Sequence, residues 1–295
     1  MRPDPALMPF ALYPIILGAI ALEIAWYLLV RRRSYPWREL LTSACIFAMR
    51  LPTKILQFGL LAPITAFVWS QRLFTIPLDT WWGLALLFLG EELCYYWLHR
   101  CSHEIRWMWA SHAVHHSPEQ IHLASAFRLS VTDTVSGGWI FFLPLIAIGF
   151  HPAGVAGMLT VNLFYQFWLH TDIVGRLGPL ERVLNTPSHH RVHHATNPEY
   201  LDRNYGGILI LWDRVFGTFA AEQPGKAIAY GLVQPIGSAN PVTILFHQWL
   251  AMARDVASAG SWRERLRQLF GRPGDSLNAV PAEGPRRPGT QSSNA

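Results

Sequence analysis

Histidine is the residue type whose number and spacing in this sequence could do chemistry. Twelve of the thirteen histidines fall within residues 99–194. Eight of them form three short motifs, H-x-x-x-H at residues 99–103 and H-x-x-H-H at residues 112–116 and 190–194. On a helix, residues three or four positions apart share a face, so their imidazoles can converge on one metal ion. The motifs therefore predict a metal site.

A structural role is the alternative for each motif taken alone, because a single histidine pair on a helix is more often part of the surface or the packing. Three motifs near the ends of apolar stretches are harder to assign to packing, since buried imidazoles need polar partners. Eight imidazoles also exceed the ligand number of one ion, so two ions are expected. The expected ligands are His99, His103, His112, His115, His116, His190, His193 and His194.

Two histidines outside this set are further candidate ligands. His170 ends an apolar stretch, and His189 directly precedes the third motif. On a regular helix, His189 points about 100° away from His190. His151 and His247 stand apart from the motifs and are expected not to bind metal.

Few acidic residues lie near the histidines, and three of them are candidates for orienting an imidazole from outside the ligand set. Glu92 shares a helix face with the first motif, and Asp172 and Asp202 lie near His-containing segments. For Glu92, a hydrogen bond between helices is the alternative role. Before the third motif, Thr186 can cap a helix whose first residue is Pro187.

The elements that must position these residues are apolar helices. The chain is 51% hydrophobic and 15% charged, whereas soluble domains carry about 25% charged residues. Residues 10–30 hold one charge, Glu23, and are long enough to cross the roughly 30 Å hydrocarbon core. The arginines at positions 31–33 predict a membrane anchor rather than a cleaved signal peptide.

Further apolar stretches cover residues 55–70, 80–98 and 137–169, and the first of them lies close to Arg50 and Lys54. The stretch at 137–169 is broken near its middle and is too short for two full crossings, so it predicts a hairpin. The predicted fold is an all-α integral membrane protein. It has about four to five membrane helices or half-helices and a cytoplasmic, histidine-rich helical cap.

Basic residues orient these helices. Four arginines lie within residues 31–38, whereas the loop after the second stretch carries only Arg72. The positive-inside rule places the first loop, and with it the three motifs, at the cytoplasmic face of a multi-pass protein. Four segments are expected: N-terminal membrane helices at 1–78, a di-metal domain at 79–220, a C-terminal helical segment at 221–270 and a disordered tail at 271–295.

Other features exclude several classes of protein. Cys45, Cys94 and Cys101 have no paired spacing, so neither a disulfide framework nor an iron–sulfur cluster is expected. The net charge of +5 comes from basic residues that flank apolar stretches, which argues against a nucleic-acid partner. Because a Gly-rich dinucleotide fingerprint is also missing, redox chemistry would need a separate electron-donor protein or a small reductant.

The ordered motifs resemble the fatty acid hydroxylase and sterol desaturase superfamily over about residues 84–218. Four further stretches are similar to the alkylglycerol monooxygenase branch of that superfamily. They are Leu184-Asn185-Thr186-Pro187-Ser188 with the third motif, Asp202-Arg203-Asn204-Tyr205-Gly206-Gly207, Trp212-Asp213-Arg214-Val215-Phe216-Gly217-Thr218 and Tyr230-Gly231-Leu232.

The resemblance implies a non-haem di-iron site that uses O₂ to hydroxylate, desaturate or oxidatively cleave a sterol, fatty acyl or alkyl-ether lipid. It also implies a membrane setting and an external electron donor, for which a reduced pterin is one candidate. Two other classes stay open. A zinc-dependent membrane hydrolase could use the same imidazoles without O₂, and a metal-binding transport protein would place its site near the bilayer midplane.

Overall fold

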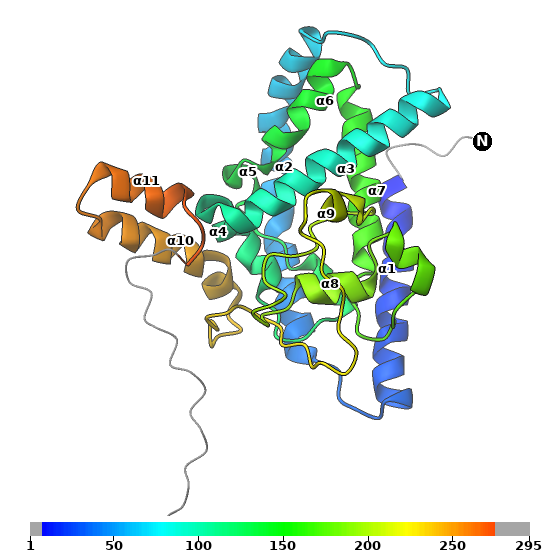
Figure 1. Cartoon of the computed structure of the whole chain (residues 1–295), viewed down its shortest axis with the longest axis vertical. Coiled ribbons are helices and arrows are strands. Elements are labelled where there is room, and N and C mark those ends of the chain that lie inside the picture. Colours follow the sequence, from blue (N-terminus) through cyan, green and yellow to red (C-terminus); the bar gives the residue numbers. More distant parts are fainter. Residues whose placement is uncertain (1–7, 275–295) are drawn as a thin grey trace, which may run out of the picture.

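The computed structural model describes residues 8–274, and within that range the chain is helical, with two isolated β-bridges and no β-strand (Figure 1). The α-helices are α1 (Met8–Ala25), α2 (Trp37–Ser70), α3 (Trp81–Glu104), α4 (Arg106–His116), α5 (Asp133–Ser136), α6 (Leu143–Ile148), α7 (Pro152–Phe167), α8 (Pro187–His193), α9 (Leu211–Val215), α10 (Pro241–Ser258) and α11 (Trp262–Phe270). The prediction of an all-helical fold is confirmed for these residues.

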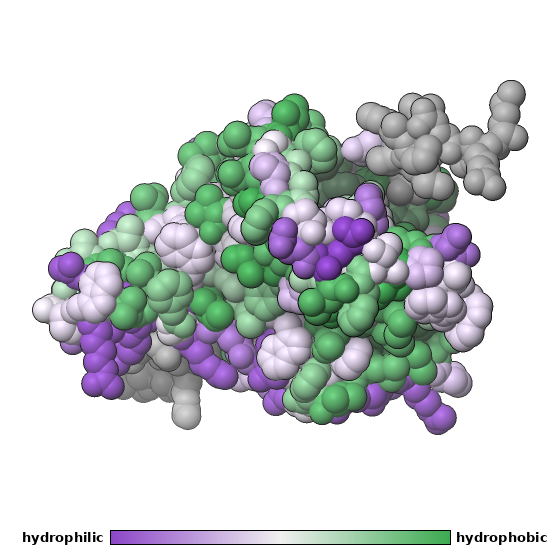
Figure 2. Space-filling view, turned by 90° about the horizontal axis from the view of Figure 1, so that it is seen from above, coloured by the Kyte–Doolittle hydropathy of each residue, from purple (hydrophilic) through white to green (hydrophobic). Residues whose placement is uncertain are grey.

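Two helical segments are long and apolar enough to cross a membrane, residues 13–30 and α2. Many of their apolar side chains point away from the protein, and Leu22, Ile55 and Phe58 are 73%, 79% and 76% exposed. Lipid stabilises exposed apolar surface on this scale better than water does. Seen from above, the molecule also presents a largely hydrophobic surface around a hydrophilic patch (Figure 2). The expected four to five spans exceed these two segments, so the larger number stays a prediction.

Helix α3 runs diagonally across the bundle and carries the first histidine motif near its end (Figure 1). Thr80 caps its start, because the threonine hydroxyl oxygen accepts a hydrogen bond from the Gly83 N–H at 3.3 Å. Glu91 and Glu92 lie on the buried side of the helix. α3 therefore combines an apolar stretch with a polar face toward the protein, and it is not one of the two candidate spans.

The apolar stretch at 137–169 forms the expected hairpin. A 3₁₀ turn (Gly138–Phe142) leads into α6, and α7 returns after a short turn. At the tip, His151 caps α7 by accepting a hydrogen bond from the Ala153 N–H at 3.2 Å, and its ring lies against Trp69 near the end of α2. His151 therefore lies at the hairpin tip, near the C-terminal end of α2, whereas the first loop leads into the N-terminal end of α2.

The C-terminal segment forms a helical pair beside α4. Arg106 of α4 donates hydrogen bonds to Asp255 of α10 and to Gln268 of α11. Ser261 and Glu264 form a capping box at the start of α11. Most of the predicted disordered tail, from residue 275 on, lies outside the described residues.

A buried carboxylate attaches the first helix to the rest of the protein. Glu23 is 3% exposed, and it accepts hydrogen bonds from the Tyr35 hydroxyl at 2.8 Å, the Leu123 N–H at 2.9 Å and the Thr171 hydroxyl at 3.0 Å. These partners come from three different parts of the chain. The single charge in the first apolar stretch therefore anchors α1 against the loops that surround the histidines.

Replacing Glu23 by Ala is expected to destabilise the protein, because three donors lose a buried acceptor at about 1–3 kcal/mol for each group left unsatisfied. Glu23→Gln keeps one acceptor oxygen and should lose less. Thermal unfolding in detergent measures both variants, with Leu22→Ala at the exposed neighbouring position as the control. Equal stability of Glu23→Ala and Leu22→Ala would contradict the anchoring role.

Candidate metal centre

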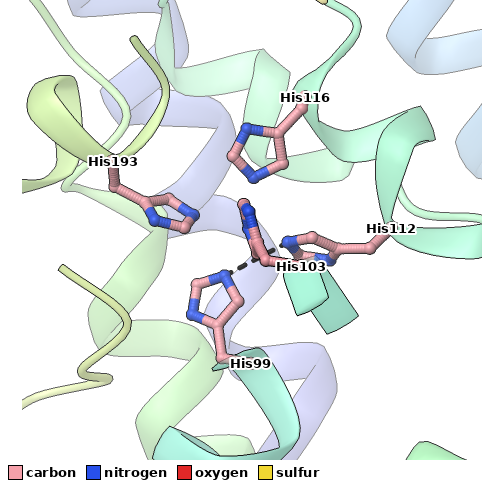
Figure 3. Close-up of side chains that lie close together, drawn as sticks. All are labelled: His99, His103, His112, His116 and His193. Atoms are coloured by element: carbon pink, nitrogen blue, oxygen red, sulfur yellow. Dashed lines mark hydrogen bonds between the residues drawn. The ribbon is translucent and has the colours of Figure 1, made fainter. Parts of the chain in front are cut away.

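Nine histidines from distant parts of the chain meet in two adjacent groups. Within each group, the candidate ligand nitrogens lie within 4.8 Å of one another. The first group is His99, His103, His112, His116 and His193 (Figure 3), and the second is His115, His170, His190 and His194. The structure thus brings together His170 and all eight histidines of the three motifs.

Each of the two H-x-x-H-H motifs divides its histidines between the two groups. On α4, the pair four residues apart, His112 and His116, faces the first group, and His115 faces the second. On α8, the assignment is reversed: His190 and His194 face the second group, and His193 faces the first. Each of these helices therefore contributes to both groups. The ring centroids of His116 and His194, one from each group, are 4.3 Å apart.

The start of α8 differs in one detail from the sequence-based prediction. Pro187 is the first residue of the helix as expected, but Thr186 forms no side-chain cap. Its hydroxyl donates instead to the Glu181 carboxylate at 3.2 Å, and the Ser188 hydroxyl donates to the same oxygen at 3.0 Å. The predicted cap was wrong because a buried carboxylate competes for the hydroxyl, and this carboxylate fixes the entry of the chain into α8.

Backbone carbonyls orient three of the imidazoles. The Nδ1 atoms of His99, His170 and His193 lie 2.9 Å from the carbonyl oxygens of Tyr205, Gln166 and Arg203. Since a carbonyl only accepts, each Nδ1 carries the proton and donates it. The Nε2 atom of each of these rings is therefore unprotonated and directs its lone pair into the cluster.

The inward-facing nitrogens carry lone pairs that can bind a cation. In the second group, Nε2 atoms approach one another at 2.9 to 3.2 Å. In the first group, the Nε2 atoms of His103, His116 and His193 are buried without a hydrogen-bond partner. Buried lone pairs that face one another are costly unless a proton or a cation lies between them. The nine histidines fit two metal ions with nitrogen ligands.

Burial keeps these imidazoles neutral. It lowers the pKa of His170 to about 4, and it lowers the pKa of His115, His190 and His194 well below the ordinary value. Desolvation of the imidazolium is the main cause, and repulsion between neighbouring imidazolium groups adds to it. Neutral imidazole is the form that binds metal.

The loop after α8 supplies two of the orienting carbonyls. Its backbone is left-handed at Asp202 and Asn204, both with φ of 58°. Asp213 holds the next turn by accepting hydrogen bonds from the N–H groups of Tyr205 and Gly206 at 2.8 and 2.7 Å. The stretches at 202–207 and 212–218 therefore act together, because the second fixes the carbonyl positions of the first.

Glu92 supports the same loop from α3. Its carboxylate accepts hydrogen bonds from the Ile208 N–H at 3.0 Å, the Leu209 N–H at 2.6 Å and the Asn162 side chain at 2.7 Å. Glu92 contacts no imidazole, contrary to the orienting role predicted for it, and its hydrogen bond with Asn162 of α7 is the alternative role, a contact between helices. Glu92 acts on His99 indirectly, because it holds the loop whose Tyr205 carbonyl orients the His99 ring. No sequence pattern predicts this role, since every residue type has a backbone carbonyl.

The remaining predicted site residues have different surroundings. The Asp172 carboxylate binds the Tyr27 hydroxyl at 2.8 Å and Arg31 at 2.6 Å, so it ties the end of the first span to the chain after His170. Asp202 Oδ1 lies 3.6 Å from His103 Nδ1 and is the acid closest to an imidazole among the three predicted ones.

His189, which the sequence suggested as a ligand, belongs to neither group, because its ring turns to the other side of α8 and packs against Phe219.

A cavity of about 390 Å³ leads to the histidines from between α2, α3, α6 and α7. His99, His112, His115 and His170 form part of its wall. Much of the rest of the wall is apolar, including Leu61, Phe142, Leu143, Ile146, Val155, Leu159 and Leu163. The arrangement can bring an apolar chain to the edge of both histidine groups while keeping water away from them.

Known proteins resemble this chain over the segment that carries the nine histidines. Residues 84–218 match the family model described as fatty acid hydroxylase. Alkylglycerol monooxygenase of Homo sapiens is 43% identical over 209 residues, which are 70% of this chain and 46% of that protein. The same enzyme of Danio rerio is 43% identical over 242 residues, 80% of this chain and 53% of that protein.

A bacterial relative is more distant. Ornithine lipid hydroxylase of Rhizobium tropici is 31% identical over 128 residues, 43% of this chain and 39% of that protein. The chain spans about half the length of the alkylglycerol monooxygenases it matches. No solved structure matches it significantly. The resemblance expected from the three histidine motifs is confirmed: residues 84–218 form a domain of the fatty acid hydroxylase family, and alkylglycerol monooxygenases are among the homologues of this chain.

Proposed function

We propose that this protein is a membrane-bound di-iron oxygenase that hydroxylates the alkyl chain of an ether lipid. One observation carries the proposal: nine neutral imidazoles form two adjacent groups at the wall of a largely apolar cavity. Iron accepts imidazole ligands, and two irons can share the electrons that O₂ reduction requires. Zinc would fit the nitrogens equally well, but the oxygenase names of the relatives favour iron.

The reaction that fits this site is a monooxygenation. One C–H bond, one O₂, two electrons and two protons give one C–OH group and one water. Iron in the two groups would supply the redox chemistry that activates O₂. The residues of the chain hold the imidazoles by their outer nitrogens, seat the alkyl chain along the apolar wall and exclude water from the oxidant.

Among lipids, an alkylglycerol is the substrate class that the homologues favour. Hydroxylation of the carbon next to the ether oxygen gives a hemiacetal, and a hemiacetal separates into an aldehyde and the free glycerol hydroxyl. Net ether cleavage then needs no hydrolytic group in the protein. Desaturation or hydroxylation elsewhere on the chain would leave the ether intact, so product analysis distinguishes these outcomes.

The setting of the reaction completes the proposal. At least the two apolar helical segments would anchor the chain, and the arginines after the first one support a position of the histidines at the cytoplasmic face. Electrons come from a separate donor protein or a small reductant, for which a reduced pterin is a candidate. The proposed reaction then takes place at the cytoplasmic face of the membrane, where both the lipid substrate and a cytoplasmic reductant are available.

Metal content tests the ligand assignment. Anaerobically purified protein should hold about two irons per chain, and His103→Ala and His190→Ala, one from each group, should each lower the iron content and abolish activity. His189→Ala and His247→Ala are the controls, because neither residue belongs to a group. Elemental analysis of the purified variants measures the effect. A control that loses as much iron as His190→Ala would refute the assignment.

Isotope incorporation tests the reaction. With ¹⁸O₂, the aldehyde formed from an alkylglycerol should carry ¹⁸O when it is trapped before exchange with water, and no product should form without O₂. Mass spectrometry of the extracted lipids detects the label. Turnover without O₂ by a zinc-containing protein would identify a hydrolase instead, and metal uptake into proteoliposomes without lipid turnover would identify a transporter.

Glu92→Gln tests the support of the loop. Gln keeps the shape of Glu92 but offers one acceptor oxygen where Ile208, Leu209 and Asn162 now share two. We expect turnover to fall roughly 10–100-fold, as for changes around a ligand shell, while the protein retains its iron. Glu91→Gln is the matched control, since one oxygen of Glu91 has no partner. Loss of iron in Glu92→Gln would contradict an indirect role.

A further inference from the structure

We propose that Arg50 and Lys54 bind the anionic headgroup of a single-chain lipid and so select the substrate that reaches the histidines. The proposal builds on the function proposed above, but it concerns ligand binding and can be tested without turnover. Both residues lie in α2, one of the two candidate membrane spans, and line the cavity that leads to the histidines. Charged groups in such a helix are costly and usually functional.

One face of α2 forms a long wall of the cavity. The α2 residues on this wall are Arg50, Lys54, Gln57, Leu61 and Thr65. They recur every three or four positions, as expected for one helix face. At about 1.5 Å per residue, the wall extends over roughly 22 Å. Its first part is cationic and polar, and Leu61 and Thr65 follow without charge. Together with the apolar residues that α6 and α7 contribute to the cavity, the lining combines a cationic part with an apolar part, as a lipid combines headgroup and chain.

The charges at the polar end do not cancel. Arg50 donates two hydrogen bonds to Oδ2 of Asp133, at 3.0 and 2.5 Å, and the Lys54 ammonium lies 3.5 Å from the same oxygen. Lys54 also donates to Gln57 at 2.6 Å. Two cations thus share one carboxylate, which leaves one positive charge at the cavity wall. A structural ion pair would need only Arg50 and Asp133, so the additional charge of Lys54 can interact with an anionic ligand.

The polar end of the cavity lies next to the histidines. The second oxygen of Asp133 accepts a hydrogen bond from the Ser111 hydroxyl at 3.3 Å, and Ser111 directly precedes His112 in α4. Ser111, His112 and His115 all line the cavity. A lipid whose headgroup binds Arg50 and Lys54 would therefore present the carbons nearest the headgroup to the histidine wall, with its tail against the apolar residues beyond.

The size and charge of the cavity define the ligand. A volume of about 390 Å³ lies at the lower end of ligand pockets, roughly 300–1,000 Å³, and suits one alkyl chain rather than two. The guanidinium and the ammonium both favour phosphate or carboxylate oxygens. The ligand class is a single-chain lipid with an anionic headgroup, either an alkylglycerol phosphate or a fatty acid.

Binding to the purified full-length protein tests the proposal. Displacement of a fluorescent fatty-acid analogue gives dissociation constants for hexadecylglycerol phosphate, palmitate and neutral hexadecylglycerol, with and without iron. We expect the wild type to bind at least one anionic lipid about tenfold more tightly than the neutral one. Comparing the phosphate with the carboxylate identifies the headgroup. A wild type without this preference would overturn the proposal.

Variants locate the preference. Lys54→Gln leaves the Arg50–Asp133 pair intact and should reduce the preference for the anionic lipid several-fold, and the double change with Arg50→Gln should abolish it. Affinity for neutral hexadecylglycerol should stay within about twofold, which also shows that the variants are folded. Arg72→Gln is the control, because Arg72 lies beyond the end of α2 against Trp69. An unchanged preference in the double variant would overturn the proposal.

The test is independent of the reaction. If the preference is lost in the variants but no lipid gives an O₂-dependent product, the headgroup site stands and the proposed oxygenase does not. If wild type and double variant oxidise anionic and neutral lipids with the same relative KM, the oxygenase stands and the headgroup site does not.

Discussion

An imidazole can bind a metal only if an unprotonated nitrogen faces the ion, and the rest of this site follows from that requirement. Neutral histidine has one proton, which must be held on the outer nitrogen. In this protein, backbone carbonyls hold it for His99, His170 and His193. A carbonyl is a fixed, uncharged acceptor, so it sets the tautomer and the ring orientation without adding charge to a buried site.

The positions of the loop carbonyls depend on an unusual backbone conformation and on buried carboxylates. Two left-handed residues, Asp202 and Asn204, bend the loop after α8, and Asp213 and Glu92 hold its N–H groups. Glu92 and His99 lie on the same helix, α3. One helix therefore supplies both a histidine and the carboxylate that steadies the loop orienting it. This arrangement explains why Glu92 is buried in α3.

Helices that lead to the histidines also line the cavity. α3 passes from an apolar start to the first histidine motif, and the α6–α7 hairpin ends at His170. The cavity between them and α2 thus joins apolar surroundings to the polar cluster within one continuous wall. A lipid could reach the histidines without leaving an apolar environment, which lowers the free-energy cost of bringing an alkyl chain to a polar site.

The sequence alone determined the all-helical class, the three motifs and the family, because helical spacing and apolar length are local properties. It also indicated His170, which follows an apolar stretch. Only the tertiary structure separated His115 from His112 and His116 and turned His189 away. It also showed that backbone carbonyls, and not Glu92, contact the outer nitrogens of His99, His170 and His193. These outcomes depend on how helices cross and where a loop bends. The contact of His99 with the Tyr205 carbonyl, for example, joins residues 106 positions apart, and no local pattern encodes it.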